Sequence, residues 1–332
     1  MAFQNLSAIS QQIQESPIAT PTPDPFESDI VPNTGLVPEQ NLRLTKDQRY
    51  FESLVGPQST NILLLGTEPT GFNFDTIVIL SIDKKSQGMK IISLPRDIYI
   101  DYSDEVLSAI KKVKPSYLQE KGIYRINAVP SIGNTIGYQK DIGRFKKPYV
   151  DFIADIIQEV FAIHINDYAY VKVSGFRKIV NYFGGVSVYV PTLMNYSDPS
   201  QNFEVYLEKG NQHLNGAESE GYVRFRQGYD HNGVYHNYGD LFRKENQSRF
   251  IKAFITQHVT LKNLGKLSKI SEIISANVIT SVKGWDAIVE YGALAEEALS
   301  DKYSIDNVEL QLTEKNIKGS SYVLIKTSGL DK

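Results

Sequence analysis

The arginines are the residues of this chain best suited to binding an anion. Of its 35 Lys and Arg residues only ten are Arg, so lysine supplies most of the surface charge. A guanidinium group can bind phosphate or carboxylate through two parallel hydrogen bonds, so the positions of these few arginines are informative. Five of them lie in segments that also carry acidic or amide side chains: Arg96, Arg125, Arg224, Arg226 and Arg243.

Arg96 follows an apolar segment in the stretch "KIISLPRDIYIDY", residues 90–102. The apolar segments 76–82 and 89–94 flank "DKKSQG" and predict a hairpin that turns at Lys85 and Ser86. This pairing places Asp75 opposite Arg96, with β-carbons about 5 Å apart. The loop before Asp75 also carries Glu68, and carboxylates beyond a strand end suit Mg²⁺. The alternative is an ordinary ion pair at the protein surface.

Arg224 and Arg226 lie two residues apart in "GYVRFRQG", residues 221–228. If this segment is extended, both side chains point to the same side. Two like charges repel unless an anion lies between them, which favours a bound phosphate. A helix would point them apart and weaken that interpretation.

Asp240, Arg243 and Gln247 are spaced three and four residues apart in "YGDLFRKENQSRF". A helix that begins near Gly239 would align them on one face. Ordinary helix capping and pairing is the alternative. His231 and His236, with Asp230 and Asp240 nearby, are a weaker candidate for a transition-metal site, and solvated loop residues are the favoured interpretation.

The elements that must position these residues alternate along the chain. Apolar segments bounded by turn residues predict strands at 61–66, 76–82, 89–94, 168–173, 186–190, about 306–312 and 321–326. Helical spacing predicts helices at 148–163, at about 240–260 and at 283–299, and a further one capped by Ser174 that stops at Gly184 and Gly185. We expect a single three-layer α/β/α domain with a central mixed β-sheet flanked by helices.

Composition limits the classes of function. A net charge of −3 gives no global basic field, so nucleic-acid binding is not supported. The absence of cysteine excludes thiolate metal sites, disulfides and cysteine nucleophiles. No segment approaches the roughly 18 apolar residues that a membrane span requires. The proline-rich start predicts a disordered or linker segment over 1–50 and a folded domain over 51–332.

Seven segments in a fixed order resemble the LytR-CpsA-Psr family over roughly residues 58–328. They are "NILLLGTE", "FDTIVILSID", "ISLPRDIYI", "RINAV" with Gly133, "VKVSGFRKIVNYFGGVSVYVP", "NQHLNGAESEGYVRFR" and "GDLFRKENQSRF". Each segment alone is weak evidence, but the ordered set is a specific signal.

The resemblance implies an extracytoplasmic enzyme of the bacterial cell envelope, with a membrane anchor that this sequence does not contain. Such enzymes transfer an anionic glycopolymer from a polyprenyl-pyrophosphate carrier at the membrane surface to peptidoglycan, with Mg²⁺ as cofactor. Residues 51–332 would then form a LytR-CpsA-Psr-like catalytic domain. We also expect an apolar pocket for the carrier chain, lined by residues from 148–163 and 285–299.

The family's pattern assigns roles to individual residues of this chain. Asp75 matches the metal-binding aspartate, with Glu68 as a second oxygen ligand. The candidates for pyrophosphate binding are Arg96, Arg125, Arg224, Arg226, Arg243 and Gln247. The candidates for catalysis are Arg96, Asp97 and Asp240, the two aspartates as general bases.

Two departures from the family's pattern leave alternatives open. Glu68 replaces the usual Asp, which keeps an oxygen ligand on a longer side chain. Asn73-Phe74 replaces an Arg-Ser pair, which removes one phosphate-binding charge. The alternatives are a polyprenyl-(pyro)phosphate-binding protein with weak or no transferase activity, and a hydrolase that cleaves the pyrophosphate with water.

Overall fold

The computed structural model describes residues 24, 43–67, 74–201, 203–260, 272, 273, 275–300, 302–317 and 319–327. These residues belong to two units. Unit A comprises Pro23–Lys85, Ile92–Tyr168 and Asp306–Lys332. Unit B comprises Met1–Thr22, Ser86–Ile91 and Ala169–Ile305. Most of segment 1–50 lies outside the described residues, so its predicted disorder and the domain limits 51–332 stay predictions.

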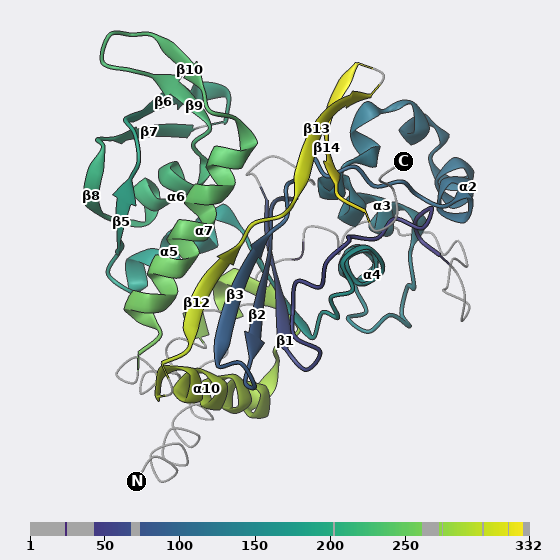
Figure 1. The fold of residues 1–332 in the computed structure, drawn as a ribbon, viewed down its shortest axis with the longest axis horizontal. Coiled ribbons are helices and arrows are strands. Elements are labelled where there is room, and N and C mark those ends of the chain that lie inside the picture. The colour runs from purple at the N-terminus through teal and green to yellow at the C-terminus, as the bar shows by residue number, and fades with distance from the viewer. Residues whose placement is uncertain are drawn as a thin grey trace. The chain divides into compact units, whose positions relative to one another are not determined.

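Two long antiparallel strands form the centre of unit A (Figure 1). They are β1 (Thr60–Thr67) and β2 (Phe74–Asp83), and both contain runs of β-branched and leucine residues. Leu63 lies opposite Ile79, and both side chains are fully buried. The backbone N–H of Leu94 donates to the Ile77 carbonyl at 2.9 Å, which is the alignment that places Asp75 opposite Arg96. The predicted register is therefore confirmed.

The described residues of unit A also form three α-helices, three 3₁₀ turns and a hairpin near the end of the chain. They are α2 (Asp104–Val113), α3 (Val129–Ile136), α4 (Pro148–Phe161), η1 (Pro115–Gln119), η2 (Lys121–Tyr124), η3 (Ile126–Ala128), β13 (Leu312–Ile317) and β14 (Ser320–Ile325). α4 begins at Pro148 as predicted, because proline suits the first helical position. Gly133 lets α3 pack on α4, since a β-carbon there would lie 2.4 Å from Cβ of Phe152.

Unit B alternates short strands with helices. Its elements are α5 (Val173–Tyr182), β5 (Val186–Val190), β6 (Met194–Asp198), η4 (Pro199–Gln201), β7 (Phe203–Leu207), β8 (Gly210–Leu214), α6 (Gly216–Arg224), β9 (Gln227–Tyr229), β10 (Tyr235–Asn237), α7 (Gly239–His258), β11 (Val278–Thr280) and α10 (Gly284–Ser300). The predicted cap at Ser174 is wrong, because α5 begins at Val173 and its N-cap is Lys172, two residues earlier. Gly184 and Gly185 follow its end with positive φ values of 87° and 95°, as a glycine stop requires.

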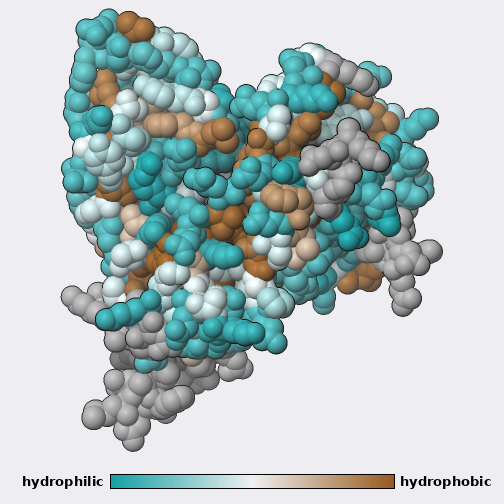
Figure 2. Space-filling model, viewed as in Figure 1, coloured by the Kyte–Doolittle hydropathy of each residue, from teal (hydrophilic) through white to brown (hydrophobic). Residues whose placement is uncertain are grey.

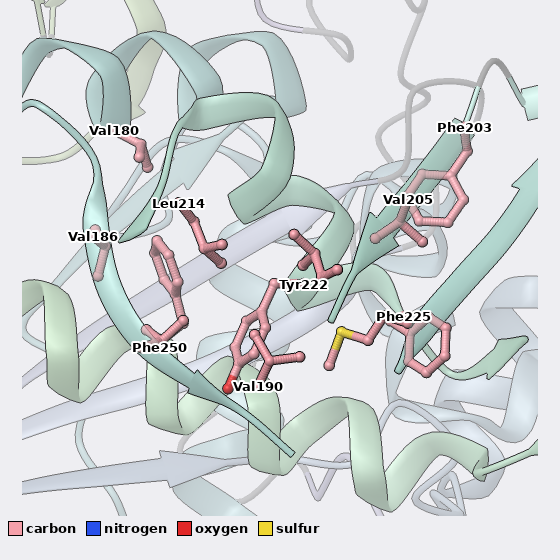
Figure 3. Close-up of a cluster of buried hydrophobic side chains, with 12 residues drawn as sticks. Val180, Val186, Val190, Phe203, Val205, Leu214, Tyr222, Phe225 and Phe250 are labelled. Carbon is pink, nitrogen blue, oxygen red and sulfur yellow. The ribbon is translucent and has the colours of Figure 1, made fainter. Parts of the chain in front are cut away.

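The core of unit B joins its small β-sheets to α6 and α7 (Figure 3). Tyr222 and Phe225, at the end of α6, are fully buried together with Phe250 of α7. The cluster also takes in valines of β5 and Phe203 and Val205 of β7. Burial of these aromatic side chains fixes the direction in which the polar residues beside them point.

Three strands complete the sheet: β3 (Gly88–Ser93), β4 (Asp167–Val171) and β12 (Ser304–Val308). The order of the six strands is β11-β4-β1-β2-β3-β12. The predicted α/β class, a central mixed sheet flanked by helices, is confirmed. Among the described residues no helix is long and apolar enough to cross a membrane. Hydrophilic side chains are spread over the face seen in Figure 2.

Candidate active site

The first charged group lies in unit A, at the N-terminal end of β2. We call it the sheet-end cluster, and its members are Asp75, Arg96, Asp97 and Arg125. Arg96 Nη1 donates to Asp75 Oδ1 at 2.9 Å, so the pair predicted from the hairpin register is present. Arg96 Nε lies 3.7 Å from Asp97 Oδ2, and Arg125 Nε lies 3.1 Å from Asp97 Oδ1. Negative and positive side chains therefore alternate through the cluster.

Backbone pairing explains why these residues meet. After Pro95 the chain turns, and the N–H of Ile98 donates to the Pro95 carbonyl at 3.0 Å. The N–H of Asn127 then donates to the Arg96 carbonyl at 3.2 Å, which brings Arg125 beside Asp97. β14 also contacts this cluster, because Arg125 Nη2 donates a hydrogen bond to the Ser321 carbonyl at 3.2 Å. Arg125 is thus positioned by tertiary contacts as well as by its place in the sequence.

The sheet-end cluster is only partly shielded from water. The side chains of Asp75 and Arg96 are 14% and 20% exposed, and that of Arg125 is 32% exposed. Asp97 Oδ1 and Arg125 Nε make no aligned hydrogen bond with a described residue, although they lie close together. Hydrogen-bonding capacity therefore remains in a partly exposed group of charges, as an anion-binding site requires.

The second charged group lies in unit B, and we call it the helix cluster: Arg177, Glu220, Arg224, Asp240, Arg243, Lys244 and Gln247. The extended interpretation of 221–228 is wrong, because α6 continues to Arg224 and only the residues after it are extended. The helix starts at a capping box in which Asn215 binds the Glu218 N–H while the Glu218 side chain binds the Asn215 N–H. This Asn-x-x-Glu spacing was the sequence signal for the helix.

Arg224 and Arg226 consequently have different surroundings. Arg224 Nη1 donates to Glu220 Oε1 at 2.5 Å, and its guanidinium lies 4.3 Å above the Phe203 ring. Arg226 lies beyond the helix and forms no side-chain ion pair with any described residue. Its carbonyl accepts the N–H of Tyr238 at 2.8 Å, which ties it to the start of α7. Arg226 is therefore the arginine of this pair with more hydrogen-bonding capacity for a ligand.

The predicted helix from Gly239 is confirmed as α7, in which Arg243 and Gln247 are buried and Asp240 is partly exposed. Asp240 pairs with Arg243 and, at 2.5 Å, with Lys244. Gln247 Nε2 donates to the Val223 carbonyl at 3.2 Å, which links α7 to α6. Arg243 is 3% exposed and Lys244 7%, so the first two turns of α7 hold two buried cations on one carboxylate.

Sequence reasoning missed three members of the helix cluster. Glu220 lies four residues before Arg224, and Lys244 lies four after Asp240, a spacing at which helical side chains meet. That signal was available once both segments were taken as helices. Arg177 is on α5, and no local spacing connects it with Glu220.

Other predicted residues remain outside these clusters. Glu68 and Asn73 lie outside the described residues. His236 Nε2 lies 3.1 Å from Asp230 and His231 Nε2 lies 3.5 Å from Glu208, so the two histidines form separate surface pairs. No group of three or more His, Asp or Glu converges in the described parts of the chain. That the sheet-end and helix clusters surround one pyrophosphate stays a prediction.

A model of the LytR_cpsA_psr family matches residues 39–332. The chain belongs to this family. The polyisoprenyl-teichoic acid–peptidoglycan teichoic acid transferase TagV of Bacillus subtilis is 25% identical over 210 residues, which are 63% of this chain and 45% of TagV. The corresponding transferase TagU of Oceanobacillus iheyensis is 22% identical over 277 residues, 82% of this chain and 73% of TagU. The match therefore spans less than half of TagV.

Solved structures of this family share the fold. The crystal structure of B. subtilis TagV has a TM-score of 0.56 at 23% identity and covers 82% of this chain and 92% of that one. A structure of TagT bound to LIIa-WTA has a TM-score of 0.55 at 19% identity, with 86% and 93% covered. At these identities the likeness concerns the fold alone.

The family implies a divalent metal, and the residues of the sheet-end cluster fit one by their chemistry. Asp75 offers a carboxylate at a strand end with its side chain 14% exposed. Mg²⁺ is held in proteins by one or two carboxylates and keeps its other positions for water and phosphate.

The apolar pocket expected beside 148–163 and 285–299 stays a prediction. On α4 the side chains of Phe152, Ile153, Ile156 and Ile157 are fully buried and form part of the core of unit A. For the other helix, the side chains of residues 284–289 lie outside the described part.

Proposed function

We propose that this protein is a Mg²⁺-dependent phosphotransferase that moves an anionic glycopolymer from a polyprenyl-pyrophosphate carrier to peptidoglycan. The observation that carries the proposal is the Arg96–Asp75 pair, at 2.9 Å, at the end of the sheet in a member of this family. The names of TagV and TagU as teichoic acid transferases to peptidoglycan support this reaction class.

The proposed reaction transfers a glycan-linked phosphoryl group. The oxygen of an acceptor hydroxyl attacks the phosphorus that bears the glycan, and the bond from that phosphorus to the bridging oxygen breaks. Polyprenyl phosphate leaves, and the hydroxyl proton passes to a base. The phosphate oxygens repel the incoming oxygen, so the site must neutralise their charge in the transition state.

Arg96 is the main proposed phosphate ligand in unit A. Its guanidinium is held by Asp75 on one edge and lies near Asp97 on another, so little side-chain entropy remains to be lost on binding. Arg125, held by Asp97 and the Ser321 carbonyl, would add a second charge. Mg²⁺ held by Asp75, with Glu68 as the proposed second ligand, would supply further charge neutralisation.

Unit B would supply the other phosphate ligands. Arg224, Arg226, Arg243 and Gln247 are the proposed contacts, and Arg226 is the arginine among them without an ion pair to a described residue. Asp97 and Asp240 are the proposed alternatives for the general base, because each is a carboxylate within its cluster. In this proposal the carrier lies in the membrane and the reaction takes place at its extracytoplasmic face.

The decisive experiment incubates the whole chain with a polyprenyl-pyrophosphate-linked glycan and Mg²⁺, with and without peptidoglycan. Release of polyprenyl phosphate that requires peptidoglycan, together with glycan attached to it, is the expected result. Release without peptidoglycan would instead identify a hydrolase. Tight binding without release would identify a carrier-binding protein, and either outcome would overturn the transferase.

A further inference from the structure

A nearly inaccessible carboxylate lies between Arg177 and Arg224 in unit B. Glu220, on α6, is 2% exposed, and a glutamate is almost never buried to this extent unless it is paired. Its Oε1 accepts from Arg224 at 2.5 Å, and its Oε2 pairs with Arg177 Nε. Each carboxylate oxygen therefore has a guanidinium partner of its own.

The packing of α6 brings these three side chains together. At the start of the helix a β-carbon on Gly216 would lie 2.3 Å from the Arg177 carbonyl, so glycine permits α6 to approach α5 at this residue. Asn181 of α5 fixes the same approach by accepting the Gly216 N–H at 2.7 Å. The Arg177 side chain is 42% exposed and reaches Glu220 from the solvent side.

Arg224 is restrained on two sides. The Glu220 carboxylate holds one edge of its guanidinium, and the Phe203 ring lies 4.3 Å from the guanidinium carbon. Close packing of β7 against Gly221, where a β-carbon would lie 2.6 Å from Val205, places that ring beneath it. A guanidinium that is held at one edge and packed on one face keeps a fixed direction.

We propose that Glu220 is a positioning residue: it holds Arg224 in the orientation that receives the substrate phosphate, and Arg177 supports Glu220 in turn. This inference rests on the proposed function and extends it to two residues that would not touch the substrate. The two arginines and one glutamate keep a net charge of +1, so the group still attracts an anion.

The test is a double-mutant cycle with Glu220→Gln and Arg224→Ala in the whole chain. Turnover of polyprenyl-pyrophosphate-linked glycan and binding of polyprenyl pyrophosphate in micelles are measured, with circular dichroism as the check of folding. We expect Glu220→Gln to lower kcat/KM about 10- to 100-fold, because a substrate-binding group that points in the wrong direction can lower the reaction rate about 100-fold. In the Arg224→Ala background the same substitution should change kcat/KM less than about threefold, since no guanidinium remains to be directed.

A purely structural role would give equal losses in both backgrounds, and that result would overturn the proposal. Glu204→Gln, an exposed glutamate on β7, is the matched control and should behave like the unmodified chain. If Glu220→Gln does not fold, Arg177→Gln acts on the same carboxylate from its exposed end. It should lower kcat/KM several-fold, again only while Arg224 is present, and equal losses in both backgrounds would overturn the proposal.

Failure of this inference differs from failure of the proposed function. If Arg224→Ala impairs turnover and Glu220→Gln does not, the positioning role fails alone. If Arg224→Ala changes neither binding nor turnover, both the phosphate-binding role of Arg224 and the positioning role of Glu220 are overturned.

Discussion

The sheet-end cluster and the helix cluster hold their charges in different ways. Asp75 and Arg96 are brought together by strand register and keep 14% and 20% of their side chains exposed. Arg243 and Lys244 are brought together by helical spacing and are almost fully buried on one carboxylate. Charges that stay partly exposed can exchange an internal partner for a ligand at a smaller cost, whereas fully buried charges depend on their partner for stability. We therefore expect substitutions in the first cluster to affect mainly turnover, and in the second also folding.

The largest expected effect is on turnover when Arg96 is replaced. Arg96→Ala should lower kcat about 100- to 1,000-fold, as the loss of one charge-stabilising donor does in other enzymes. The unfolding midpoint should barely change, because the side chain is partly exposed. Arg96→Lys, which keeps the charge but lacks the planar fork, should recover part of the rate. Unchanged turnover in Arg96→Ala would end its proposed role.

The next effect is on stability when Asp240 is replaced. Asp240→Asn leaves Arg243 and Lys244 buried without their anion, and should lower the free energy of unfolding by about 3 kcal/mol. Asp75→Asn, measured by the same urea titration, should cost about 1 kcal/mol or less. Equal costs for the two substitutions would contradict the distinction between the clusters.

A smaller effect is expected on metal dependence. Asp75→Asn should raise the Mg²⁺ concentration for half-maximal turnover about tenfold or more, because an amide is a weaker ligand than a carboxylate. The measurement is turnover against Mg²⁺ concentration after removal of metal with a chelator. Asp83→Asn, at the other end of β2, is the matched control. An unchanged Mg²⁺ profile in Asp75→Asn would remove this residue from the metal site.

The smallest effect concerns Arg226, the member of the arginine pair without an ion pair to a described residue. Arg226→Ala should weaken polyprenyl-pyrophosphate binding several-fold and change the free energy of unfolding by less than about 0.5 kcal/mol. Arg224→Ala should instead lower both binding and stability, because it leaves Glu220 with one partner. Calorimetric binding and urea unfolding of both variants give the comparison. A larger stability loss for Arg226→Ala would show that it has a structural role.

Local patterns in the sequence predicted the parts of both clusters that depend on neighbours in one element or one hairpin. The alignment of the segments around "DKKSQG" gave the pairing of Asp75 with Arg96, and the spacing of Asp240 and Arg243 gave their contact in α7. The segment 221–228 was harder, because Tyr222, Val223 and Phe225 also suit a strand. The capping box at Asn215 and the burial of Tyr222 and Phe225 favour the helix.

By itself the sequence determined the α/β class, the family, the long helices, half of the strands that the structure describes and the register of the hairpin around "DKKSQG", because these follow from periodicity and turn chemistry along the chain. Only the tertiary structure decided that Arg177 reaches Glu220 from another helix and that Arg125 lies beside Asp97. It also decided that Lys244 is buried. A side chain's burial and its distant partners depend on how elements pack, and packing brings together residues that no spacing in the sequence connects.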